Sequence, residues 1–146
     1  MRIRELAPED QAGWLELWAG YLRFYRAEVS DEVTRTTFER LSGSRPDMFA
    51  LVAADPAGEL VGLAHSIVHP STFSLNGYCY LEDLFVARAA RGSGAARELI
   101  DATAAAALQR GVNRVYWQTQ QFNGPARSLY DTVGQLTSMV VYEREL

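Results

Sequence analysis

The pattern of hydrophobic and polar residues divides the first half of the chain into a strand, two helices and a hairpin. Residues 2–5 predict a short edge strand. Apolar residues then recur at helical spacing over residues 14–25, and a second helix is predicted over residues 30–41 with Ser30 as its N-cap. Two apolar runs, residues 48–54 and 60–68, flank a turn-forming tetrapeptide, which predicts a β-hairpin.

The second half has the pattern of a strand, a crossover helix and a second strand. Residues 78–86 are apolar on both faces of a strand, which is typical of a strand buried inside a sheet. Residues 95–110 carry an apolar stripe at helical spacing, and residues 112–119 return as a strand. The two strands of such a unit are expected to be parallel. A helix following Asn123 and a last strand over residues 139–144 complete the predicted order.

Composition limits the class of protein. A chain of 146 residues, 48% hydrophobic and 22% charged, is expected to form one soluble domain over residues 1–146. No apolar run approaches the roughly 18 residues of a membrane span, and the N-terminal decapeptide lacks the apolar core of a signal peptide. We therefore expect a cytoplasmic protein with no membrane partner.

Charge excludes several kinds of chemistry. All 14 basic residues are arginine, so that the chain has neither a phosphate-loop lysine nor a Schiff-base lysine. The net charge of −4 disfavours nucleic acid as a partner, because binding to a phosphate backbone needs a basic surface. Cationic molecules fit this charge better.

Cysteine and histidine give no metal site. The single cysteine, Cys79, lies in the predicted buried strand, where inert packing is favoured over a reactive thiol. His65 and His69 are four residues apart on or beside a strand, about 13 Å, which is too far for both to bind one ion. We therefore expect no metal cofactor, although His65 could face a pocket.

A small-residue turn, Arg91-Gly92-Ser93-Gly94-Ala95-Ala96, joins the central strand to the long helix. Side chains this small allow backbone N–H groups to approach a ligand closely. The first N–H groups of a helix have no internal partner and carry partial positive charge, which favours an anion. The turn is therefore a candidate phosphate site, with a tight connection that binds nothing as the alternative.

Two sequence blocks together resemble the GCN5-related N-acetyltransferase (GNAT) superfamily, which binds acetyl-coenzyme A. The turn from Arg91 to Ala96 matches the signature Gln/Arg-x-x-Gly-x-Gly/Ala between a strand and a helix. The second block, Asn123-x-x-Ala126-x-x-Leu129-Tyr130-x-x-x-Gly134, follows the next strand. The resemblance covers residues 78–134 and implies an α/β fold: a mixed, largely antiparallel sheet with helices on both faces and splayed central strands.

The resemblance also implies how acetyl-coenzyme A binds. Its pyrophosphate would rest on backbone N–H groups of residues 92–96, with Arg91 adding charge, and Asn123 would contact the pantetheine arm or cap its helix. The acetyl carbonyl would accept a backbone N–H near Leu84 or Phe85. The expected cofactor-binding residues are Leu84, Phe85, Val86, Arg91, Gly92, Ser93, Gly94, Ala95, Ala96 and Asn123.

Two side chains are the catalytic candidates. The resemblance assigns Tyr130 as the general acid that protonates the departing thiolate; the alternative is a tyrosine that only closes the core. Glu82 is a carboxylate in an apolar strand, where burial would raise its pKa toward the range of a general base; the alternative is a pair with an arginine. Asp83 is expected on the opposite face of the strand.

The acceptor is the least determined part of the prediction. The run Tyr80-Leu81-Glu82-Asp83-Leu84-Phe85-Val86 is similar to the central strand of diamine and polyamine acetyltransferases, which favours a small primary amine. Tyr21, Phe24 and Tyr25 are candidates for its pocket, unless their helix simply packs on the sheet. The alternatives are a peptide acceptor and a non-catalytic acyl-coenzyme A binding module. Members of this superfamily often form dimers, so a homodimer is a further expectation.

Overall fold

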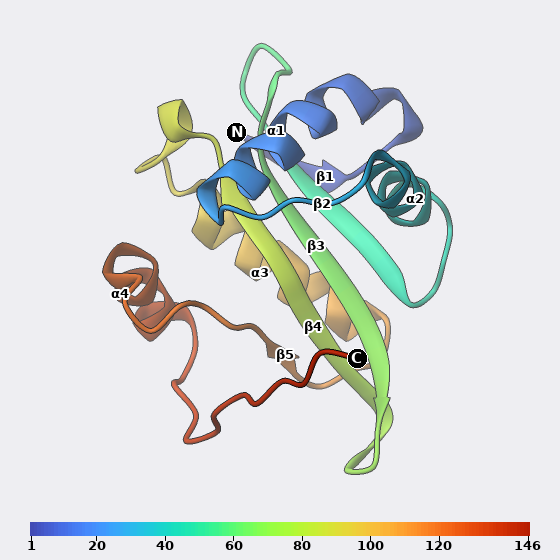
Figure 1. The fold of residues 1–146 in the computed structure, drawn as a ribbon, viewed down its shortest axis with the longest axis vertical. Coiled ribbons are helices and arrows are strands. Elements are labelled where there is room, and N and C mark those ends of the chain that lie inside the picture. Colours follow the sequence, from blue (N-terminus) through green and yellow to red (C-terminus); the bar gives the residue numbers. More distant parts are fainter.

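A computed structural model describes residues 1–146 as one five-stranded sheet with helices on both faces (Figure 1). The strands follow one another across the sheet in the order β1-β2-β3-β4-β5. The elements in chain order are β1 (Arg2–Glu5), a 3-10 turn (Pro8–Asp10), α1 (Gln11–Phe24), α2 (Asp31–Ser42), β2 (Met48–Ala54), β3 (Leu60–Ser71), β4 (Ser74–Val86), a 3-10 turn (Arg88–Ala90), α3 (Ala95–Gln109), β5 (Val115–Tyr116) and α4 (Gly124–Val133).

The sheet is mixed and largely antiparallel, which confirms the predicted fold class. The first four strands pair in antiparallel fashion, and β4 pairs with β5 in parallel. The predicted hairpin is present as β2 and β3, and its turn closes through Gly58 N–H donating to Asp55 O. Ser30 caps α2 as predicted, because its hydroxyl accepts the N–H of Val33.

Two hydrophobic cores lie on opposite faces of the sheet. Helices α1 and α2 cover one face, where Trp14 is fully buried against Phe38 and Leu63. Helix α3 covers the other face and appears behind the sheet in Figure 1, with Leu99 fully buried. No helix combines the length and the apolar character that crossing a bilayer requires.

A β-bulge interrupts β4 and overturns one expectation. In the β3–β4 register His65 pairs with Asp83, and Ser66 pairs with Leu81, so that Glu82 is the extra residue. A bulge breaks the alternation of side chains between the two faces. Leu81 and Leu84 therefore both pack in the α3 core, whereas Glu82 and Asp83 both lie toward α1. The prediction that Asp83 points to the opposite face from Glu82 is wrong.

The strands at the end of the chain are shorter than predicted. The strand expected over residues 112–119 forms a ladder only at Val115 and Tyr116. The strand predicted over residues 139–144 is wrong for this structure, because residues 135–146 form neither helix nor strand. Their apolar side chains have nothing to pack against, so β propensity alone does not make a strand there.

Candidate active site

The central feature of the site is a gap between β4 and β5. The two strands pair only at Cys79–Val115 and Tyr80–Tyr116. Beyond Tyr80, β4 continues to Val86 without a strand partner on the edge that faces β5. Residues 117–119, which follow β5, make no backbone–backbone hydrogen bond. The splay expected from the resemblance is therefore present, and the backbone groups along both walls are free for a ligand.

The hydrogen-bond pattern of β4 identifies which N–H groups face the gap. Ala87 N–H donates to Val61 O. Since bonded and non-bonded pairs alternate along an antiparallel ladder, the N–H groups of Phe85 and Asp83 are directed to β3. The N–H groups of Leu84 and Val86 therefore point away from β3, toward the gap. Of the two residues predicted to hold the acetyl oxygen, Leu84 has the required direction and Phe85 does not.

The turn before α3 has the geometry of an anion cradle. Gly92 and Gly94 have φ of +80° and +90°, and a Cβ at either position would meet nothing within 4 Å. Left-handed backbone of this kind favours glycine. The N–H groups of Gly92, Gly94 and Ala96 have no backbone acceptor, and Ala95 N–H has only a long contact of 3.4 Å with Ser93 Oγ. The predicted phosphate-binding turn thus presents several unpaired donors at a helix N-terminus.

Gly94→Val is expected to weaken acetyl-coenzyme A binding about tenfold, which corresponds to roughly 1.4 kcal/mol. A branched side chain at φ +90° is strained, and it projects into the open space in front of the free N–H groups. Gly58→Val is the matched control, because Gly58 has φ +89° and equally open surroundings in a hairpin turn. Calorimetric titration of both variants should show weakened binding in the first alone; equal affinities would contradict the cradle.

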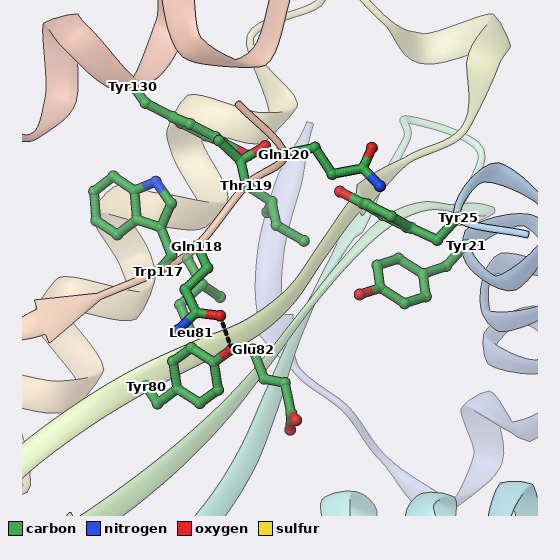
Figure 2. Close-up of a pocket in the computed structure, with 11 residues that line it drawn as sticks. Tyr21, Tyr25, Tyr80, Leu81, Glu82, Trp117, Gln118, Thr119, Gln120 and Tyr130 are labelled. Carbon is green, nitrogen blue, oxygen red and sulfur yellow. Dashed lines mark hydrogen bonds between the residues drawn. The ribbon is translucent and has the colours of Figure 1, made fainter. Parts of the chain in front are cut away.

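A pocket of about 300 Å³ opens at the gap. Figure 2 shows Tyr21 of α1 and Tyr25, the residue that follows α1, on one side and Tyr130 and Trp117 on the other. The pocket is aromatic and acidic, with no basic side chain in its wall. Its lining residues are Tyr21, Tyr25, Tyr80, Leu81, Glu82, Leu84, Trp117, Gln118, Thr119, Gln120 and Tyr130.

Tyr130 projects from α4 into this pocket, where the resemblance places the general acid (Figure 2). Its ring packs edge-on against Trp117, with ring centroids 5.6 Å apart. Burial, with a smaller contribution from Tyr25, raises the pKa of Tyr130 to about 12. The phenol therefore keeps its proton at neutral pH and can donate it.

Glu82 lines the pocket from β4 and makes no ion pair with an arginine. Partial desolvation and the neighbouring Asp83 raise the pKa of the Glu82 carboxyl, while His65 opposes the shift. Its side chain remains open to solvent, so that a proton taken from a ligand can leave to water. The geometry does not support the alternative of a structural pair with arginine.

Asp83 belongs to a polar chain buried beneath the pocket. Trp14 Nε1–H donates to His65 Nε2 at 2.9 Å, so that the other ring nitrogen, Nδ1, carries the hydrogen shared with Asp83 Oδ2 at 2.9 Å. Burial raises the pKa of Tyr21, and the negative charge of Asp83 adds to the shift. Asp83 therefore accepts from His65 at the floor of the pocket. His65 lies in this chain, 3% exposed, and does not line the pocket.

Several predicted site residues lie outside the pocket, among them Phe24, Arg91 and Asn123. Phe24 is half exposed and packs against Arg91, whose guanidinium carbon is 5.4 Å from its ring centroid. Arg91 also donates from Nε to Val86 O, so it stands at the edge of the turn. Asn123 precedes α4, but its side chain does not cap the helix; it makes a long contact with Thr119 Oγ1 instead.

Sequence reasoning missed one wall of the pocket. Tyr80 and the run from Trp117 to Gln120 line it, and the Tyr80 hydroxyl approaches Gln118 Oε1 at 3.4 Å (Figure 2). Their position in the sequence could have identified them. They directly follow the short parallel strand β5, and residues at the point where a strand separates from its neighbour border the gap between the two. Asp83 was missed because a bulge is not visible in a hydrophobic pattern.

The two histidines and the cysteine are engaged in local contacts. His69 contacts the Tyr116 hydroxyl through Nε2 and Pro70 O through Nδ1. Cys79 is fully buried, and burial raises the pKa of its thiol. The structure contains no group of three or more His, Cys, Asp or Glu side chains that could hold a metal ion.

The splayed strands and the glycine turn are features that the resemblance to the GNAT superfamily implies. The sequence model of the Acetyltransferase (GNAT) family matches residues 14–134. The chain is also 32% identical over 143 residues to D-amino-acid N-acetyltransferase HPA3 of Saccharomyces cerevisiae, covering 97% of this chain and 89% of that one. This protein therefore belongs to the GNAT family and is an N-acetyltransferase.

Further relatives agree on the family and the fold. Uncharacterized N-acetyltransferase YhfO of Bacillus subtilis is 32% identical over 134 residues, covering 92% of this chain and 89% of that one. The structure of aminoglycoside acetyltransferase AAC(6')-Iy with a coenzyme A bisubstrate analogue superposes with a TM-score of 0.85 at 17% identity, covering 99% and 97% of the two chains. Ribosomal-protein-alanine N-acetyltransferase of Brucella melitensis biovar Abortus 2308 gives 0.80 at 23% identity over the full length of both.

Proposed function

We propose that this N-acetyltransferase transfers the acetyl group of acetyl-coenzyme A to the primary amine of a small, polyamine-like cation. The observation that carries the proposal is the composition of the pocket wall, in which Glu82 and four tyrosines stand without any basic side chain. Asp83 lies directly behind this wall. Carboxylates and aromatic faces both stabilise an ammonium group.

Acetyl-coenzyme A fits the residues present. The free N–H groups of Gly92, Gly94 and Ala96 would hold the pyrophosphate, and those of Leu84 and Val86 would line the pantetheine arm and the acetyl group. Arg91 would add positive charge at the edge of the turn, although its stacking on Phe24 keeps it away from the pocket. We propose that residues 1–146 work as one such domain.

The proposed reaction is direct transfer in a ternary complex. Glu82 removes a proton from the acceptor ammonium, directly or through water, and the amine nitrogen then attacks the acetyl carbonyl carbon. The Leu84 N–H stabilises the negative charge that develops on the carbonyl oxygen. As the carbon–sulfur bond breaks, Tyr130 gives its proton to the leaving thiolate, and the second proton of the attacking nitrogen leaves to water, from which Tyr130 is protonated again. The products are an acetamide and free coenzyme A.

A second acceptor class has support from a relative. The name of the yeast relative gives D-amino acids as its substrates, and it covers almost all of this chain. An amino acid carboxylate would have to enter a pocket that contains Glu82 and no cation, which disfavours it here. A peptide is a third class of acceptor, which would also have to place its amine beside Glu82.

Release of free coenzyme A thiol should separate these acceptors. The panel contains diamines and triamines, D- and L-amino acids, their carboxamides, an aminoglycoside and short peptides, beside a control without acceptor. We expect kcat/KM to be highest for the diamines and triamines, and about tenfold higher for a D-amino acid carboxamide than for its acid, since removing the carboxylate removes repulsion by Glu82. Preference for the free D-amino acid would overturn the proposed acceptor.

A further inference from the structure

The guanidinium group of Arg91 is held between two aromatic rings at the beginning of the glycine turn. Its central carbon lies 5.4 Å from the ring centroid of Phe24 and 5.9 Å from that of Phe85. Its Nε–H donates to Val86 O at 3.3 Å, and none of the ion pairs of the structure includes it. The charge of Arg91 is therefore fixed in place but not neutralised by a carboxylate.

The ring of Phe24 does not contribute to a hydrophobic core. Phe24 is 50% exposed, and it belongs to neither of the two cores that enclose the sheet. It meets Tyr25 edge-on, with ring centroids 5.0 Å apart, and it lies under the guanidinium of Arg91. A guanidinium over an aromatic face is attracted to it electrostatically. The contact with Arg91 is therefore an interaction for which this exposed ring is suited.

The last turn of α1, which carries Phe24, ends in a defined closure. Arg26, with φ of 51°, is the only non-glycine residue of the chain with a positive φ. Ala27 N–H donates to Leu22 O at 2.9 Å across this left-handed residue, in the type of closure that glycine usually makes. A residue with a side chain is strained there. The closure nevertheless ends the helix at this point and holds Phe24 in its last turn.

The same cluster extends to the wall of the acceptor pocket. Tyr25 contacts Tyr21, with ring centroids 4.8 Å apart, and Tyr21 meets Phe85 edge-on at 6.3 Å. The contacts from Arg91 through Phe24, Tyr25, Tyr21 and Phe85 thus return to Arg91. Figure 1 shows the end of α1 beside the segment that follows β4. The glycine turn and the acceptor wall therefore share one cluster of side chains.

We propose that Phe24 is a positioning residue for acetyl-coenzyme A, which acts by holding the Arg91 guanidinium where it attracts the pyrophosphate. The inference rests on the proposed placement of the pyrophosphate at the glycine turn. A free arginine side chain loses rotamer freedom when it binds a phosphate. The two rings and Val86 O restrict Arg91 before the ligand arrives, and its two terminal nitrogens make no hydrogen bond, so they remain free to donate.

Calorimetric titration with acetyl-coenzyme A tests the role of the ring. Phe24→Ala is expected to raise Kd about fivefold, the usual contribution of an exposed contact between a guanidinium and a ring. Phe24→Tyr keeps the ring and should keep the affinity. Leu15→Ala is the matched control, because Leu15 is a 41% exposed apolar residue of the same helix that does not line the pocket. Equal weakening by Phe24→Ala and Leu15→Ala would overturn the specific role of Phe24.

A double variant decides whether Phe24 acts through Arg91. Arg91→Gln removes the charge and is expected to weaken acetyl-coenzyme A binding about tenfold. In that background Phe24→Ala should cause no further loss, since the guanidinium that the ring positions is absent. If the two losses add, Phe24 contributes to binding independently of Arg91, and the proposal is overturned.

A fragment of the cofactor separates this inference from the proposed cofactor site. S-acetylpantetheine carries the same thioester and arm but no pyrophosphate, and NMR titration can follow its weaker binding. Phe24→Ala should leave the Kd of this fragment unchanged. An equal loss of affinity for both ligands would overturn the inference and leave the cofactor site in place. Failure of the unmodified chain to bind acetyl-coenzyme A would reject both.

Discussion

Tyr130→Phe is expected to lower kcat by roughly 100-fold, the usual contribution of a general acid, while acetyl-coenzyme A binds with affinity within about threefold of the original. The substitution removes one hydroxyl and keeps the ring that packs on Trp117. Since the pKa of Tyr130 is raised to about 12, the phenol is protonated throughout the neutral range, and its loss should lower the rate without changing the pH profile. Turnover and calorimetric affinity are the two measurements.

Tyr78→Phe is the matched control for this experiment. Tyr78 is a half-buried tyrosine of β4 that stacks under Arg114 and does not line the pocket. The same loss of a hydroxyl there should leave kcat unchanged. Full activity of Tyr130→Phe would remove it from the role of acid. A large loss of acetyl-coenzyme A affinity with little change in kcat would instead make it a binding residue.

The features around the site that could be predicted from sequence depend on backbone and local residue type. The turn at Gly92 and Gly94 needs left-handed backbone at both glycines, so its shape follows directly from residue type. The splay between β4 and β5 follows from a family resemblance carried by two blocks.

The errors arise where tertiary structure changes a local pattern. A bulge at Glu82 shifts every later residue of β4 by one face, and periodicity cannot show an inserted residue. Phe24 has the helical position expected of a pocket residue, but Arg91 attracts its ring to the outside. The segment at residues 139–144 has strand propensity but forms no strand, because propensity alone does not supply the paired backbone that a strand requires.

The bulge produces an arrangement of side chains that regular alternation between the two faces of a strand would not allow. It sets two carboxylates in consecutive positions on the same side of β4, one in the pocket wall and one behind it. Glu82 is accessible, and its pKa is raised by desolvation and by Asp83, as a base requires. Asp83 is fixed by His65 and is only 13% exposed, as suits a positioning group. The strand irregularity thus separates the two proposed roles.

Glu82→Gln is therefore expected to reduce kcat/KM by roughly 100-fold at neutral pH and to flatten its dependence on pH. A base acts only when deprotonated, so activity should rise as pH passes upward through the raised pKa of Glu82, and this rise should be absent in the amide. The remaining slope would come from the acceptor amine alone. The measurement is kcat/KM for one diamine across a series of buffers.

Asp83→Asn separates proton removal from positioning. The amide can still accept a hydrogen bond from His65, but it no longer carries the charge that acts on His65 and Tyr21. We expect a raised KM for the acceptor and a lower melting temperature, with the pH dependence of Glu82 retained. If Asp83→Asn flattened the pH profile and Glu82→Gln did not, the base would be Asp83, and the exposed carboxylate would serve only to attract the cation. If neither variant changed the profile, the acceptor would reach the site already deprotonated, and the carboxylates would contribute binding alone.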